Sequence, residues 1–138
     1  MLRGRSEKFI VIRSNEGFYV GDISYILGDD VYQNFWGAQY KFADGLFTVN
    51  PITHLAFAVA ATAYGTAYGD GVYYDNEGND YAVSAGNIGL VPLELAAKER
   101  GLRLGQVFLT PGAASFHCFE GTFTIKLPKD LLIRIDTR

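Results

Sequence analysis

The stretch QVFLTPGAASFHCFEGTFTIKLPKDLLIRI, residues 106–135, decides the fold that the sequence predicts. It consists of four short apolar runs separated by Pro-Gly, Glu-Gly and Pro-Lys-Asp, which are turn-forming combinations. In the third run, residues 122–127, apolar side chains at the odd positions alternate with Thr and Lys at the even positions. Alternate residues of a strand share a face, so this run predicts a strand with one buried face and one open face. The four predicted strands are 106–109, 115–119, 122–127 and 131–135.

Shorter extended runs precede this stretch. Residues 8–13, KFIVIR, end at the turn sequence Ser-Asn-Glu-Gly, and residues 18–20 then resume an extended pattern. We therefore expect these two runs to pair as a hairpin. Residues 73–74 and 81–83 flank the polar sequence DNEGND at 75–80, which indicates a second hairpin. The other predicted strands are two fragments within 39–49, the long segment 54–68 and residues 88–91.

Two short helices are predicted between the strands. In residues 29–36, DDVYQNFW, apolar side chains recur four positions apart, Asp29 is a good N-cap residue and a glycine follows. Residues 93–100, LELAAKER, come directly after Pro92 and before Gly101, residue types that typically begin and end a helix. We expect both helices to pack on the sheets that the strands form.

Length and composition agree with one mainly β domain. The 138 residues fall in the range of a single domain, and no linker or run of charges divides them. Hydrophobic residues make up 49% of the chain, enough for a core, and the many glycines, tyrosines and phenylalanines favour strands with tight turns. The predicted architecture is a single domain over residues 1–138, mainly β and α+β at the margin. It is built as an antiparallel sandwich or a partly closed barrel.

Charge and hydropathy bear on the kind of partner. The net charge is −3, the sequence pI is about 5.3 and the basic residues are scattered, so we expect no binding to a nucleic-acid backbone. The longest apolar run, 55–61, is far shorter than the ~20 residues that a membrane helix needs. The N-terminal sequence does not read as a signal peptide. A cytoplasmic protein without membrane contact is the simplest interpretation.

Metal and nucleophile sites have few residues to draw on. The single cysteine, Cys118, excludes an internal disulfide framework and a cysteine-based zinc cluster, and two histidines exclude an all-histidine metal site. His117 and Cys118 are neighbours, so on a strand their side chains point to opposite faces and cannot pair. A pairing of Cys118 with His54 would need a tertiary contact. We expect no cofactor.

A tandem repeat, TAYGTAYG at residues 62–69, is the most informative feature for function. On an extended backbone its threonines and tyrosines share one face, and its alanines and glycines share the other. Tyrosine rings side by side, facing away from the core, would form a platform for a planar ligand such as a nucleobase. The alternative makes the tyrosines half-buried partners of other aromatic residues, with Gly65 and Gly69 at bulges. The predicted ligand-binding residues are Thr62, Tyr64, Thr66, Tyr68 and Tyr73.

Several carboxylates near the repeat are candidates for hydrolysis or metal binding. Their spacing does not match an EF-hand loop, because Gly78 lies three positions after Asp75 and no glutamate stands at position twelve. Asp22 and Asp70 each follow a glycine at the end of an extended run, so folding could bring two acid–base groups together. An anion site on the glycine-rich residues 65–71 would be opposed by Asp70. The candidate metal ligands are Asp22, Asp70, Asp75 and Asp80.

Three segments resemble a family of small uncharacterised proteins of bacterial and phage genomes. They are GDISYIL at residues 21–27, TAYGDGVY at 66–73 and AGNIGLVPL at 85–93. The resemblance spans residues 21–93, about half of the chain, and implies no activity, ligand or catalytic residue. It implies an origin in mobile elements, for which a phage-encoded inhibitor or sponge of a host defence component would be a fitting role.

The sequence supports three hypotheses on function. The first is a non-catalytic binding module, expected to be a homo-oligomer, whose Thr/Tyr face binds a small nucleotide-like ligand or a protein partner. The second is a hydrolase that uses carboxylates or a divalent metal ion. The third is a structural or interaction subunit, which predicts a large flat apolar patch and no pocket.

Overall fold

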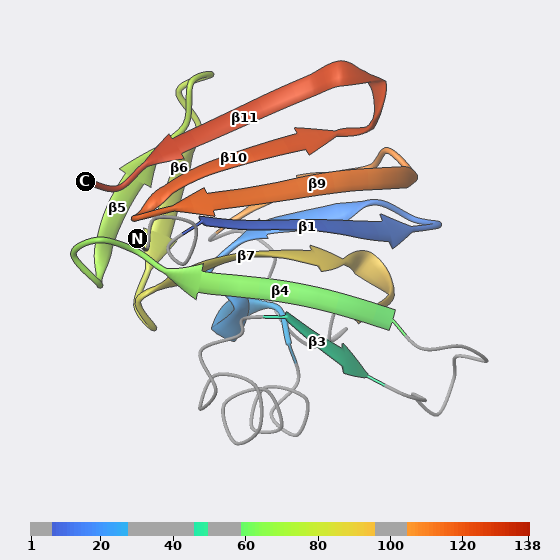
Figure 1. Cartoon of the computed structure of the whole chain (residues 1–138), viewed down its shortest axis with the longest axis horizontal. Helices are drawn as coiled ribbons and strands as arrows, with labels where there is room; N and C mark the ends of the chain where they lie inside the picture. The colour runs from blue at the N-terminus through green and yellow to red at the C-terminus, as the bar shows by residue number, and fades with distance from the viewer. Residues whose placement is uncertain (1–6, 28–45, 50–58, 96–104) are drawn as a thin grey trace.

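The computed structural model describes residues 7–27, 46–49, 59–95 and 105–138. Within these ranges the chain is mainly β, as predicted, with eleven strands in antiparallel sheets that do not close into a barrel. The strands form a four-stranded, a five-stranded and a two-stranded sheet (Figure 1). Apolar side chains from all three sheets meet in one core cluster, which defines the inside of the described part.

The four-stranded sheet has the order β1–β9–β10–β11, and every neighbouring pair in it is antiparallel. β10 has the predicted bounds, and its three apolar side chains are buried as predicted. β9 begins at Gly112 instead of residue 115, because its pairing with β1 continues until Gly112 lies opposite Ser14. The strands of this sheet are β1 (Glu7–Ser14), β9 (Gly112–Phe119), β10 (Thr122–Leu127) and β11 (Leu131–Asp136).

The five-stranded sheet has the order β3–β4–β7–β2–β8. Its strands are β3 (Leu46–Val49), β4 (Val59–Gly65), β7 (Asn87–Pro92), β2 (Phe18–Gly21) and β8 (Gln106–Phe108). The predicted first hairpin is wrong, since β1 pairs with β9 whereas β2 pairs with β7 and β8. The turn between β1 and β2 carries the chain from one sheet to the other. Buried Glu94 holds this turn by accepting hydrogen bonds from the Ser14 hydroxyl and the Asn15 N–H.

The two-stranded sheet is the predicted second hairpin, formed by β5 (Gly71–Tyr74) and β6 (Asp80–Val83). Its turn lies against the outer edge of β11. There the Asn76 side chain imitates a strand backbone: its Nδ2 donates to the Leu132 carbonyl at 3.1 Å, and its Oδ1 accepts the Arg134 N–H at 2.8 Å. These bonds cover part of an edge that would otherwise be open to pairing with another strand.

Helical structure in the described residues is limited to short 3₁₀ turns, η2 (Ile23–Tyr25), η5 (Leu93–Leu95) and η6 (Pro128–Asp130). The predicted helix 29–36 lies outside the described residues. Of the predicted helix 93–100, only η5 lies inside them. Within the described ranges, no helix is both long and apolar enough to cross a membrane.

The two large sheets differ in how they are covered. The main core lies between them, where inward side chains of β9, β10 and β11 meet those of β2 and β7. A second cluster, which includes Tyr19, Ala63 and Val91, covers the opposite face of the five-stranded sheet, and β7 is therefore buried along its whole length. The four-stranded sheet has its second face open: Phe9 on that side is 65% exposed. We call this side the outer face.

Candidate functional site

The tandem repeat does not form the predicted platform. β4 ends at Gly65, and the second copy of the repeat bends away instead of continuing the strand. Ala63 belongs to the second cluster whereas Tyr64 packs against the main core, so both faces of β4 are covered. The Tyr64 ring stacks on Phe116 with ring centroids 6.1 Å apart and an interplanar angle of 26°, while Tyr68 is 77% exposed. The two tyrosine rings therefore share no face, and the predicted geometry is wrong.

Two other residues of the predicted platform hold the turn after β4. The Thr66 hydroxyl donates to the Gly69 carbonyl at 2.7 Å, and the Tyr73 hydroxyl donates to the same carbonyl at 2.8 Å. The Thr66 N–H donates to the Gly86 carbonyl at 2.9 Å, which joins this turn to the one before β7. Thr66 and Tyr73 thus stabilise this turn, while the stacking of Tyr64 on Phe116 fits the alternative of a half-buried tyrosine packed against another aromatic residue. Ligand binding by the five candidate residues stays a prediction, now without the shared surface that motivated it.

Thr62, the first residue of the repeat, is fully buried, and its hydroxyl makes no hydrogen bond. A desolvated hydroxyl without a partner costs about 1–3 kcal/mol. We expect Thr62→Val, which nearly keeps the shape and removes that group, to raise the free energy of unfolding in urea by about 1 kcal/mol. Thr66→Val is the matched control, because it loses the bond to Gly69 and should destabilise the protein. A loss of stability in Thr62→Val would mean that the hydroxyl has a partner such as an ordered water.

Asp22 is a structural carboxylate. It is fully buried, and each of its oxygens accepts two hydrogen bonds. Oδ1 accepts the N–H and the hydroxyl of Ser24 at 2.9 and 2.7 Å, and Oδ2 accepts the N–H groups of Ser84 and Ala85 at 2.8 and 2.7 Å. The side chain thus caps η2 and fixes the β6–β7 turn. Four bonds fill the acceptor sites of a carboxylate, so Asp22 does not offer the acid–base or metal-binding group that the sequence predicted.

Asp75 closes the β5–β6 turn in a similar way. Its Oδ1 accepts the N–H groups of Glu77 and Asn79, and its Oδ2 accepts the Asn79 side-chain N–H and the Tyr81 hydroxyl, the latter at 2.6 Å. Burial acts to raise the pKa of Asp75, but the hydrogen bonds from Tyr81, Asn79 and Glu77 outweigh it and lower that pKa. Burial, together with the bond to Asp75, raises the pKa of Tyr81. Asp75 is therefore an ionised structural group.

The remaining candidates for chemistry are dispersed. Asp70 is exposed in the turn after β4, and Asp80 is exposed at the start of β6. In the ranges that the structure describes, no three His, Cys, Asp or Glu side chains are placed to hold a metal ion. The predicted opposition of His117 and Cys118 is confirmed, because Cys118 belongs to the main core and His117 lines a hollow on the outer face. His54 lies outside the described residues.

The outer face carries a hollow of about 400 Å³, the first hollow below. Alternate residues of each strand point to this side, and the pairing register aligns them across the sheet. Thr124 lies between His117 on β9 and Arg134 on β11, so these three side chains form one row. Among the described residues, its lining comes from three strands and the C-terminal Arg138: His117, Phe119, Thr122, Thr124, Arg134 and Arg138.

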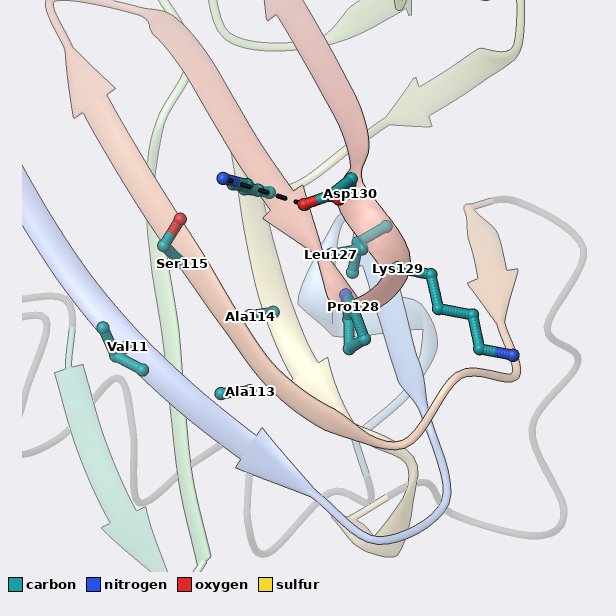
Figure 2. A pocket seen from close by; sticks show the side chains of 9 residues that line it. Val11, Ala113, Ala114, Ser115, Leu127, Pro128, Lys129 and Asp130 are labelled. Carbon is teal, nitrogen blue, oxygen red and sulfur yellow. Dashed lines mark ion pairs between the residues drawn. The ribbon is translucent and has the colours of Figure 1, made fainter.

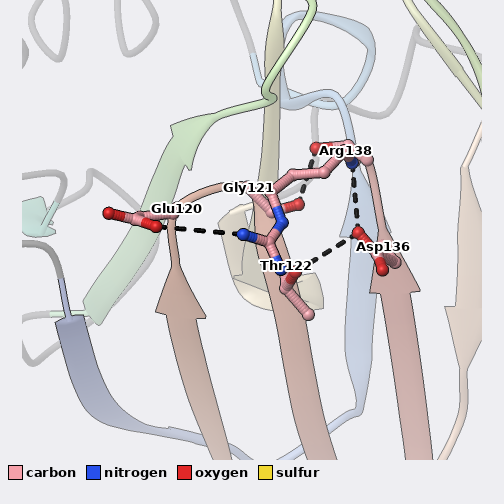
Figure 3. A network of polar contacts seen from close by, with 6 residues as sticks. Glu120, Gly121, Thr122, Asp136 and Arg138 are labelled. Atoms are coloured by element: carbon pink, nitrogen blue, oxygen red, sulfur yellow. Dashed lines mark hydrogen bonds and ion pairs between the residues drawn. The ribbon is translucent and has the colours of Figure 1, made fainter.

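Two residues that line the first hollow, Thr122 and Arg138, belong to a network of polar contacts (Figure 3). The Arg138 guanidinium lies 3.8 Å from a Glu120 carboxylate oxygen, and the Arg138 N–H donates to Asp136 Oδ1 at 3.1 Å. The Thr122 hydroxyl donates to the same oxygen at 3.3 Å. The hydrogen bond from the Arg138 N–H is the main cause of a lowered pKa at Asp136. Arg134 makes no ion pair with any carboxylate of the described residues.

A second hollow of about 280 Å³ lies on the same face, further along β9 and β10 (Figure 2). The Lys126 ammonium is 4.0 Å from an Asp130 carboxylate oxygen, and both side chains are largely exposed. Lys129 extends from η6 and makes no ion pair with the described residues. Cations thus line both hollows. The second is lined by Val11, Ala113, Ala114, Ser115, Lys126, Leu127, Pro128, Lys129 and Asp130.

Positive charge is concentrated on the outer face. Every lysine and arginine whose side chain the structure describes lies on this sheet or at its turns: Arg13, Lys126, Lys129, Arg134 and Arg138. Among the described side chains of this sheet and its turns, four carboxylates accompany them, and five positive minus four negative groups make +1. These carboxylates are Glu16, Glu120, Asp130 and Asp136. The basic residues are scattered along the sequence, and the strand pairing gathers them.

The alternation in residues 122–127 correctly predicted that Thr124 and Lys126 lie on the open side of a strand. It did not predict the two hollows that these residues line. The available signal was the polar alternation in residues 131–136, where Arg134 is flanked by buried isoleucines. That pattern predicts which residues face out, but not which strand lies alongside.

Comparisons of the chain with protein families, with curated proteins and with solved structures find no match.

Proposed function

We propose that the protein is a non-catalytic binding module that holds a planar, phosphate-bearing ligand of the nucleotide class on its outer face. The supporting observation is the first hollow, which brings together two guanidinium groups, an imidazole, a phenyl ring and two threonine hydroxyls. The ligand class is the one expected from the tandem repeat, but the proposed site is a different one.

Arg134 and Arg138 are the proposed phosphate ligands. A guanidinium presents planar N–H donors that match two phosphate oxygens at once. Arg138 already lies close to the carboxylates of Glu120 and Asp136. Arg134 makes no ion pair with the described residues, so it can bind a phosphate without first breaking one. Arg134 is therefore the principal phosphate ligand in this proposal.

The aromatic side chains are the proposed contact for the planar part of the ligand. Phe119 is 38% exposed, and the rings of Phe9 and His117 lie with centroids 6.5 Å apart, tilted by 56°. Exposed aromatic faces bind bases by stacking, which depends little on the identity of the base. A volume of about 400 Å³ falls within the roughly 300–1,000 Å³ of small-molecule sites.

Arg134→Ala is expected to weaken binding of thymidine monophosphate by about tenfold or more, because a hydrogen bond to a charged group contributes about 1.5–3 kcal/mol. Isothermal titration calorimetry on the full chain measures this, and thymidine in place of its monophosphate isolates the contribution of the phosphate. Arg13→Ala is the matched control, because Arg13 is exposed on the same sheet but does not line the first hollow. Both changes lie on the surface and should alter the free energy of unfolding by no more than about 0.5 kcal/mol.

Two results would contradict this proposal. One is the absence of thymidine monophosphate binding by the native chain. The other is equal affinity of the native chain and Arg134→Ala, which would place the phosphate elsewhere.

A further inference from the structure

We infer that the ligand of the outer face is a single-stranded nucleic acid that runs across both hollows. The inference rests on the proposed function and narrows its ligand class. A mononucleotide would occupy the first hollow, around Arg134, and leave the second, around Lys126 and Lys129, without a role. Both hollows lie on one face, and cations line each of them.

The two hollows adjoin along the strands. The row of Thr124 lines the first hollow, and the row of Lys126, two residues further along β10, lines the second. Rows two residues apart are separated by about 7 Å, close to the distance between successive phosphates of an extended single strand. From Ala113 to Phe119, β9 itself covers about 20 Å. Several nucleotides of an extended strand therefore fit along the face.

Exposed aromatic rings on the same face offer surfaces for bases. Phe9 is 65% exposed and Phe119 is 38% exposed, although phenylalanine is among the residues most often buried. Phe9 lies opposite His117 in the pairing of β1 with β9, and Phe119 lies two residues further along β9. Rings exposed beside cations are the arrangement by which proteins bind single strands with little dependence on sequence.

Charge favours a nucleic acid over a second copy of this chain. A two-fold dimer built on the outer face would bring onto itself a face whose described cations outnumber its described carboxylates, and such an excess of like charge opposes association. The same cations attract a phosphate backbone. The expectation of no backbone binding rested on the acidic chain and its scattered basic residues, whereas the fold gathers five cations beside four carboxylates among the described side chains of this sheet and its turns.

The test compares a fluorescein-labelled oligothymidylate of twelve nucleotides with thymidine monophosphate, both with the full chain. Fluorescence anisotropy should show the oligonucleotide binding about tenfold more tightly or better, with affinity that falls as salt rises. Lys129→Asn should weaken the oligonucleotide about fivefold and leave thymidine monophosphate unchanged, since Lys129 lies outside the first hollow. Asparagine tolerates the φ of 66° at this position, so the turn should be kept. Arg134→Ala should weaken both ligands.

The outcomes separate this inference from the proposed function. Equal affinities for the two ligands, both dependent on Arg134, would overturn the inference and leave the proposed function standing. No binding of either ligand would overturn both. A dimer in native mass spectrometry that Phe9→Glu dissociates, with no oligonucleotide bound, would assign the face to a second copy and overturn the inference.

Discussion

Asp22→Ala is expected to lower the free energy of unfolding by about 3 kcal/mol, as measured by urea denaturation with far-ultraviolet circular dichroism. Four donors lose their acceptor: the N–H and the hydroxyl of Ser24, and the N–H groups of Ser84 and Ala85. Each buried donor left without an acceptor costs about 1–3 kcal/mol, and water that enters the site recovers part of the sum. The change therefore loosens two turns at once.

Asp70→Ala is the matched control for this prediction. Asp70 also follows a glycine, but it is exposed and its side chain makes no hydrogen bond with the described residues. Its replacement should change the free energy of unfolding by less than about 0.5 kcal/mol. Asp22→Asn keeps one acceptor oxygen and should fall between the two. Equal losses in Asp22→Ala and Asp70→Ala would be incompatible with the role assigned to Asp22.

Gly89→Ala is expected to lower the melting temperature by about 10 °C, which corresponds to roughly 3 kcal/mol in a chain of this size. A Cβ atom at this position would lie 2.4 Å from the Thr62 carbonyl oxygen, 2.5 Å from Ile23 Cγ2 and 2.9 Å from Ala63 Cβ. The carbonyl belongs to the paired strand β4 and cannot move without loss of the pairing. Overpacking against backbone costs at the upper end of the usual 1–3 kcal/mol, or more.

Gly65 lies on β4, the strand paired with β7. Gly65→Ala is expected to raise the melting temperature, although the chemical change is the same as in Gly89→Ala. The nearest atom to its added Cβ would be the Gly86 carbonyl oxygen at 3.7 Å, an ordinary contact. Alanine in a strand is more stable than glycine by about 0.5–1 kcal/mol, so the melting temperature should rise by about 2 °C. Differential scanning fluorimetry measures both variants. Similar shifts for the two glycines would mean that the packing of β4 against β7 differs from this structure.

Local patterns predicted β10 and the β5–β6 hairpin correctly. In β10 the alternation of apolar and polar residues is unbroken and ends at a proline, and the predicted bounds 122–127 are those observed. In the hairpin, the sequence DNEGND contains both the glycine and the Asp75 carboxylate that close the turn. The information in both cases lies within a few residues of the chain, where a single-sequence pattern can report it.

The failures share one cause, which is that strand partners are chosen at a distance. Residues 8–13 and 18–20 look like a hairpin, yet β1 pairs with β9, about a hundred residues away along the chain. The repeat shows a small face and a Thr/Tyr face, but only the packing of Phe116 onto Tyr64 reveals that the second face is covered too. The two-residue alternation of side chains along a strand predicts which residues share a face, but it does not predict what packs against that face.

The sequence by itself determined that the chain is mainly β, where several strands begin and end, and which side chains of a strand such as β10 face together. These properties follow from backbone preferences and alternation between residues close in the chain. Only the tertiary structure decided that Asp22 holds the distant β6–β7 turn and that Arg134, His117 and Phe119 line one hollow. Their positions depend on which distant strands pair, and that choice reflects the apolar area buried by the whole fold, which no local pattern contains.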